Sequence, residues 1–232
     1  MTNSTSIYKV LLLQRNPSGE RTAIATARDV LIPALSTNSP ARVVVSWSAE
    51  QRPRTVVPLQ TTPLRMLSVW LPEPPAVRDL AAVLEPVDPG VEVFAVQASE
   101  PIPPRLPAAD AGSPAVVLLT LLRRARGLDD ATFLHEWHDR HTPLAMRVHP
   151  LQGYVRNVID PATAHSPDPP DGIVEEQYAD ARTIARPWRM FGHNGAWRSA
   201  ANMWRVWRHV RTFLDLDRAE NWLMHQVEVE LA

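Results

Sequence analysis

The residues best suited to chemistry lie in one stretch, 127–157, which contains His135, His138 and His141. These histidines stand three residues apart, which spreads them over an arc of roughly 120° on an ideal helix. A metal site on one helix usually needs two histidines four residues apart and a further ligand elsewhere. The sequence HEWHDRH lacks that spacing. We therefore expect no metal site here, and we expect His135 and His138 to lie on the solvated surface.

His141 differs from the other two because it continues an apolar stripe. The members of the stripe recur at spacings of four, four, three and four, the period of a helix that buries one face; they are Phe133, Trp137, His141, Leu144 and Val148. Asp129 is a good N-cap for this helix, and Thr142-Pro143 predicts a bend or restart beside His141. A buried imidazole needs hydrogen-bond partners, so His141 is either a core histidine or a proton-transfer residue.

Two adjacent carboxylates, Glu175 and Glu176, form the second candidate. They lie in a strand-like segment at 171–177, where alternation sends them to opposite faces. A glutamate that faces an apolar layer has a raised pKa, which suits general acid or base catalysis. The alternative is a structural ion pair with an arginine such as Arg123 or Arg156.

The segment 181–214 is the third candidate, with seven arginines, four tryptophans and no acidic residue. A heptad-like stripe predicts the buried face of a helix, formed by Ala200, Met203, Trp207, Val210 and Leu214. The other tryptophans could wall a ligand pocket, stack on nucleobases, form a subunit contact or fill the core beside solvated arginines. The glycine-bounded loop 192–195 could act as a lid. We expect a substrate pocket lined by Trp137, Trp188, Trp197, Trp204 and His193.

Composition narrows the classes of function. The 232-residue chain has 45% hydrophobic and 21% charged residues, which is typical of a globular protein. A net charge of −1 gives no general attraction to nucleic acid or to anionic membranes. Cysteine is absent, which excludes disulfides and thiolate nucleophiles. We see no signal peptide, membrane-spanning run, phosphate-binding glycine loop, dinucleotide fingerprint or GxSxG motif, so we expect a cytoplasmic protein without a cofactor.

The order of elements predicts an α+β fold. The first half reads β-α-β-β-α-β, with strands at 7–14, 42–48, 67–71 and 91–97 and helices at 21–35 and 76–84. A proline-rich segment, 99–114, is the predicted linker. The second half repeats the order, with strands at 115–122, 153–159, 173–178 and 224–231. We therefore expect two tandem ferredoxin-like units, 1–98 and 115–232, whose uncovered sheet faces pack together and close a barrel.

Residues 115–232 resemble the EthD family of dimeric α/β-barrel proteins. The resemblance is carried by an arginine at 123 or 124, Phe133, Trp137, His141 with Pro143, the pair Tyr154 and Asn157, and Asp171-Gly172 leading to Glu175. It implies a two-unit barrel, here formed by one chain, and it favours Glu175 as the inward carboxylate. A homodimer of the whole chain is a further expectation.

The sequence leaves three classes of function open, of which the resemblance implies the first two. The first is a cofactor-independent acid–base enzyme, of the dehydratase, cyclase or isomerase type, that acts on a small hydrophobic, aromatic or polyketide-like compound. The second is an accessory protein of an oxidative degradation pathway, such as ether breakdown. The third is a small-molecule-binding protein without chemistry.

For the enzyme, we predict that His141 and Glu175 act together as base and acid. Burial would favour the neutral form of His141. Tyr154 and Asn157 would orient a substrate oxygen. Alternation places these two on opposite faces of a strand, so both can contribute only if a bulge or a strand end intervenes.

Overall fold

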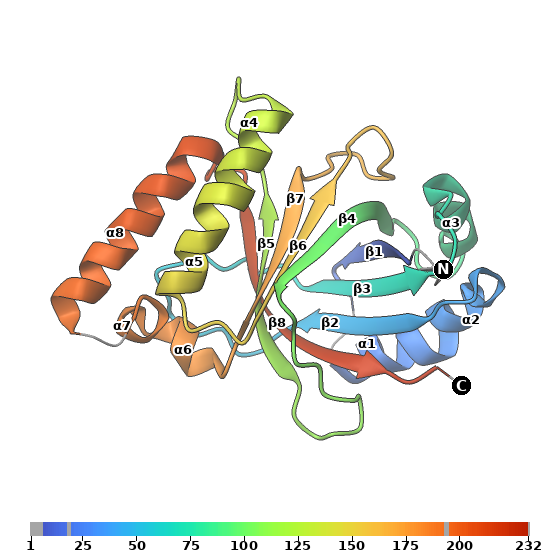
Figure 1. The fold of residues 1–232 in the computed structure, drawn as a ribbon. Coiled ribbons are helices and arrows are strands. Elements are labelled where there is room, and N and C mark those ends of the chain that lie inside the picture. Colours follow the sequence, from blue (N-terminus) through green and yellow to red (C-terminus); the bar gives the residue numbers. More distant parts are fainter. Residues whose placement is uncertain (1–6, 18–19, 193–194, 232) are drawn as a thin grey trace, which may run out of the picture.

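The computed structural model describes residues 7–17, 20–192 and 195–231. In these residues eight strands form a closed barrel, in the order β1-β3-β2-β8-β5-β7-β6-β4, and neighbouring strands are antiparallel (Figure 1). The strands are β1 (Tyr8–Arg15), β2 (Arg42–Ser48), β3 (Leu64–Leu71), β4 (Glu92–Ile102), β5 (Ala115–Leu122), β6 (Gly153–Ile159), β7 (Gly172–Tyr178) and β8 (Glu220–Val229). Most carry β-branched and leucine residues, which suit a pleated, buried surface.

Each half of the chain contributes four neighbouring strands, in the orders β4-β1-β3-β2 and β8-β5-β7-β6. Exchanging the two halves maps the strand order of the barrel onto itself, so the halves are related by a pseudo-twofold. The edges of the two sheets are joined by the pairs β2–β8 and β4–β6. The predicted tandem barrel in one chain is therefore confirmed, and its closure leaves no strand edge unpaired among the eight described strands.

The predicted linker at 99–114 begins too early. Strand β4 continues to Ile102 and pairs with β6, with a register shift between Ser99 and Ile102. Pro101 lies within this irregular part, where a missing amide donor is tolerated. Pairing with β6 alone thus holds residues that local propensity assigns to a loop, because the pairing of β4 with β1 ends at Val96. The connection that follows also touches the barrel, through a parallel bridge between Ala108 and Glu228.

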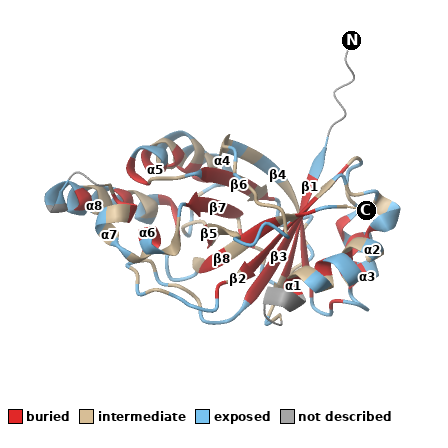
Figure 2. Cartoon of the chain, turned by 90° about the horizontal axis from the view of Figure 1, so that it is seen from below, coloured by how far each residue is buried: buried red, intermediate tan, exposed pale blue. Residues whose placement is uncertain are grey.

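The helices cover the outside of the barrel, where α1–α3 flank the first-half strands and α4–α8 flank the second-half strands (Figure 1). The buried residues gather on the strands and on the helix faces turned towards them (Figure 2). The first-half helices are α1 (Glu20–Thr26), η1 (Ala27–Leu31), α2 (Ile32–Ala34), η2 (Ser36–Asn38) and α3 (Val77–Leu84). The second-half helices are α4 (Asp130–His135), η3 (Glu136–His141), α5 (Thr142–Val148), α6 (Ala181–Ala185), α7 (Pro187–Met190) and α8 (Ala196–Phe213).

The first long helix of each half contains a π-helical segment, η1 and η3, followed by an α-helical turn with proline near its start. The helix does not restart beside His141. The backbone keeps right-handed helical angles through His141 and Thr142, where the winding changes from π-helical to α-helical, and the Thr142 hydroxyl donates to the Trp137 carbonyl instead of capping a new helix. Asp129 caps α4 by accepting a hydrogen bond from the Thr132 amide at 2.7 Å. Pro33 is accommodated within the predicted helix 21–35, because it stands in the first turn of α2, where its missing amide proton costs little.

The barrel interior holds an apolar cluster, which includes Phe94 and Trp222, and a buried ion pair. Lys9 on β1 lies 3.1 Å from Glu175 on β7, so the pair joins the two halves of the chain. Glu175 also accepts hydrogen bonds from Asn157 at 2.9 Å and from Gln226 at 2.7 Å. A buried charge is tolerated only with partners of this kind.

We predict that Lys9→Met destabilises the protein by about 3–5 kcal/mol, because Glu175 would remain buried without its counter-charge. Urea unfolding at neutral pH measures this loss. The double variant Lys9→Met, Glu175→Met removes both charges and should recover part of the stability. A loss below about 1 kcal/mol in the single variant would show that the pair does not hold the barrel together.

Candidate functional site

A cavity of about 620 Å³ lies outside the barrel, between the second-half sheet and the helices that cover it. Strands β5, β6, β7 and β8 form its floor, helices η3, α7 and α8 form its walls, and residues 56–58 of the first half reach its rim. Its size is typical of sites for drug-sized molecules. The aromatic residues of its lining are Trp137, Tyr154, Phe191, Trp204, Trp207 and Phe213.

His141 stands at the end of η3 and lines this cavity. Its ring stacks on His209 of α8 with centroids 5.4 Å apart, and it tilts against Phe213 at the same distance. The buried Nδ1 atom has no hydrogen-bond partner among the described residues. Burial, followed by repulsion from His209 and His149, lowers the pKa of His141 from 6.5 to about 3. The imidazole is therefore uncharged at neutral pH and keeps an unused polar atom.

Glu176 supplies a carboxylate to the same cavity. It accepts a hydrogen bond from the Tyr178 hydroxyl at 2.9 Å, and Tyr154 lies opposite it in the β6–β7 register. Burial, and then the nearby charge of Glu176, raises the pKa of both tyrosines. Their hydroxyl groups consequently stay protonated at neutral pH and remain hydrogen-bond donors.

His149, just after α5, is a further polar residue of the lining. Its Nδ1 lies 2.9 Å from the carbonyl oxygen of Met190, and its ring packs edge-on against Phe191 at 5.0 Å. Because a carbonyl only accepts, Nδ1 carries a proton and donates it to this oxygen. No local pattern in the sequence marks His149, because its partner lies 41 residues away along the chain.

Of the four predicted catalytic residues, His141 and Tyr154 line the cavity, whereas Glu175 and Asn157 face the barrel interior. The prediction that His141 and Glu175 meet in one cavity is therefore wrong. Alternation along β7 turns Glu175 towards Lys9 and gives the outward position to Glu176. Burial alone would raise the pKa of Glu175, but Lys9, Asn157 and Gln226 together lower it, as expected of a structural ion pair.

Only some of the predicted pocket residues line the cavity. Trp137 and Trp204 line the cavity, while Trp188 and Trp197 are outside its lining and are 56% and 90% exposed. Trp207, predicted as buried, is 41% exposed, lines the cavity and stacks on Trp204 with centroids 5.0 Å apart. The buried residues of α8 are Ser199, Val206 and Phe213, each one residue before a predicted position, while Met203 and Val210 are half-buried. His193 lies outside the described residues.

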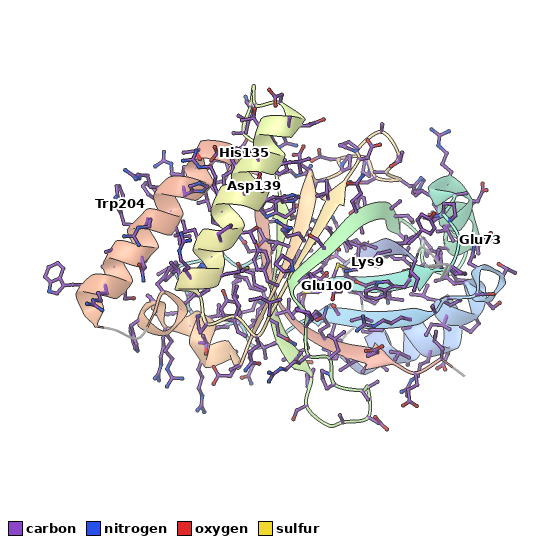
Figure 3. All side chains as sticks on the ribbon, viewed as in Figure 1. Lys9, Glu73, Glu100, His135, Asp139 and Trp204 are labelled. Carbon is purple, nitrogen blue, oxygen red and sulfur yellow. The ribbon has the colours of Figure 1, made fainter. Side chains whose placement is uncertain are left out.

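The remaining histidines of the motif do not form a metal centre. His135 is on the surface, where its ring nitrogen lies 2.9 Å from Asp139 (Figure 3). His138 is half-buried against Trp137, with ring centroids 4.9 Å apart. Over residues 7–17, 20–192 and 195–231, no group of three or more histidine or acidic side chains is placed to hold a metal ion. In the same ranges, no helix combines the length and apolar character that a bilayer crossing requires.

The fold and the cavity define a dimeric α/β barrel contained in one chain, and solved structures share this architecture. An anthrone oxidase-like protein superposes with a TM-score of 0.60 at 12% identity, covering 95% of this chain and 91% of its own. A candidate monooxygenase of Fusobacterium nucleatum gives a TM-score of 0.54 at 9% identity, with 95% and 92% covered. Residues 125–195 match the EthD domain, which confirms the predicted resemblance over that segment. No curated protein matches the sequence.

The lowered pKa of His141 predicts a pH-dependent stability. Its folded-state value lies below the unfolded-state value, so between pH 6.5 and 3 only the unfolded chain binds the proton, and stability falls as the pH falls. This residue alone should cost roughly 2 kcal/mol at pH 5 relative to pH 7.5. Urea unfolding at the two pH values should show a smaller loss for His141→Asn. An equal loss in both proteins would contradict the assignment.

Proposed function

We propose that the protein is a cofactor-independent acid–base enzyme, of the dehydratase, cyclase or isomerase type, whose substrate is a small hydrophobic, aromatic or polyketide-like molecule. One observation carries the proposal: an uncharged histidine with an unpaired ring nitrogen shares a largely apolar cavity with a carboxylate and a protonated tyrosine. These groups are sufficient to remove a proton and to stabilise the resulting oxyanion.

Glu176 is the proposed base. Its carboxylate takes a proton from a carbon next to a substrate carbonyl, and the electron pair of the C–H bond moves onto the carbonyl oxygen. In an isomerisation the same proton returns to another carbon, and in a dehydration it leaves with a β-hydroxyl group as water. One oxygen of Glu176 is held by Tyr178, which fixes the carboxylate in place.

His141 is the proposed electrophile. A neutral imidazole can donate its N–H to the carbonyl oxygen as that oxygen becomes an enolate, without the cost of desolvating a cation. The low pKa makes His141 a weak base, which is why the proton is assigned to Glu176. The Tyr154 hydroxyl is the second donor of this oxyanion site. This arrangement keeps two of the four predicted catalytic residues and replaces Glu175 by its neighbour.

The alternatives are an accessory role in an oxidative degradation pathway and ligand binding without chemistry. The names of the two structural neighbours, anthrone oxidase-like and monooxygenase, favour the oxidative reading. An anthrone is a tricyclic aromatic ketone with an acidic C–H group. Such a molecule also fits the acid–base proposal, since removal of that proton is the step that Glu176 and His141 would assist.

The test is exchange of the acidic C–H protons of anthrone in D₂O, followed by NMR. We expect the wild-type protein to accelerate exchange and Glu176→Gln to lose at least about 100-fold, the usual contribution of a general base. His141→Asn should lose a comparable factor, with its melting temperature at pH 7.5 within a few degrees of wild type. Trp197→Ala, which alters an exposed residue outside the cavity, is the matched control and should keep the full rate.

Exchange no faster than in buffer, or an undiminished rate in Glu176→Gln, would contradict the proposal. Unfolding of His141→Asn at pH 7.5 would assign this histidine to the core.

A further inference from the structure

The described lining of the cavity has an acidic side chain and no basic side chain that is permanently charged. Among the described residues of its lining, the carboxylate of Glu176 is the one acidic group, and neither lysine nor arginine is present. Of the two lining histidines, His141 is uncharged at neutral pH, and the Nδ1 proton of His149 is directed at the Met190 carbonyl. Within the described part of the lining, a ligand in this cavity therefore meets the Glu176 carboxylate and neither a lysine nor an arginine.

The nearby arginines are engaged elsewhere. Arg156 donates to the Ser99 hydroxyl at 3.0 Å, on the side of β6 that faces β4. Arg140 forms an i, i+4 ion pair on the surface of η3. Arg211 lies over the ring of the half-exposed Trp207, 4.4 Å from its centroid. Each of them would have to leave a present partner before it could contact a ligand in the cavity.

These surroundings affect the three charge classes of ligand differently. A carboxylate would lose its hydration in an apolar cavity and be repelled by Glu176, with no cation to offset either cost. A hydroxyl group could donate a hydrogen bond to Glu176. An ammonium group would gain the attraction of the same carboxylate, together with the faces of Trp137 and the other lining aromatics.

We propose that the cavity admits uncharged and cationic aromatic ligands and excludes aromatic carboxylates, and that Glu176 is the residue that sets this preference. The inference rests on the proposed function, because it takes the cavity to be the ligand site. It goes further by assigning a charge class to the substrate: a neutral hydroxylated aromatic or an aromatic amine, and not an aromatic acid.

The experiment compares three ligands of nearly equal shape: 2-naphthylmethanol, 2-naphthylmethylamine and 2-naphthoate. Binding is measured at pH 7.5 by quenching of tryptophan fluorescence and confirmed by calorimetry. We expect the alcohol and the amine to bind at least ten times more tightly than the acid. Added salt should weaken the preference for the amine over the acid only slightly. Salt screens buried charges less than exposed ones, and the Glu176 carboxylate is buried.

Glu176→Gln is the decisive variant, since glutamine keeps the shape and can still accept the Tyr178 hydrogen bond. It should weaken amine binding at least tenfold, improve binding of the acid and change binding of the alcohol by less than threefold. The matched control is the double variant Lys9→Met, Glu175→Gln, which removes the neighbouring carboxylate and its counter-charge from the barrel interior. It should keep the wild-type order of the three ligands.

The outcomes separate this inference from the proposed function. If the acid binds as tightly as the alcohol, or if Glu176→Gln keeps the wild-type order, the charge preference is wrong while an acid–base role of the cavity can still hold. If none of the three ligands binds, the cavity is not an aromatic ligand site and both proposals fail. If the predicted order is found without any proton exchange on anthrone, the charge preference stands and the enzyme assignment fails.

Discussion

Closure of the barrel is the constraint on which the rest of the structure depends. Each half of the chain forms a four-stranded sheet with two open edges, and these edges are satisfied only by the other half, through β2–β8 and β4–β6. The interior follows the same rule, because Lys9 from the first half neutralises Glu175 from the second. The halves are thus alike in strand order, but neither half can pair its own sheet edges or neutralise its own buried charge.

Closure also decides the composition of the candidate site. Strand β7 is buried on both faces, by the barrel core on one side and by the helices on the other. Period-two alternation then gives Glu175 and Glu176 opposite surroundings: a saturated ion pair inside, and a largely apolar cavity outside. A slip of one residue in the pairing of β7 with β5 and β6 would exchange the two carboxylates. The position of the cavity carboxylate is therefore fixed by strand register.

Local patterns predicted the succession of strands and helices and the helix face that carries Phe133, Trp137 and His141, because helical and strand periods are properties of neighbouring residues. Such patterns could not predict which of Glu175 and Glu176 faces the barrel interior, because the inner and outer faces of β7 are defined by strands that are distant in the sequence. Helix α8 shows the same limit. Its tryptophans recur at helical spacing, but the cavity beneath the helix lets Trp207 remain half-exposed where a continuous core would have covered it.

The pseudo-twofold has a consequence for how such a barrel can change over generations. In a barrel built from two identical chains, each substitution is made twice, and a residue near the axis meets its own copy. Here the two halves are encoded separately, although both keep a π-helical segment in their first long helix. A substitution beside the cavity alters one location alone. The first half can therefore accumulate changes suited to supporting the barrel while the second half changes around the cavity.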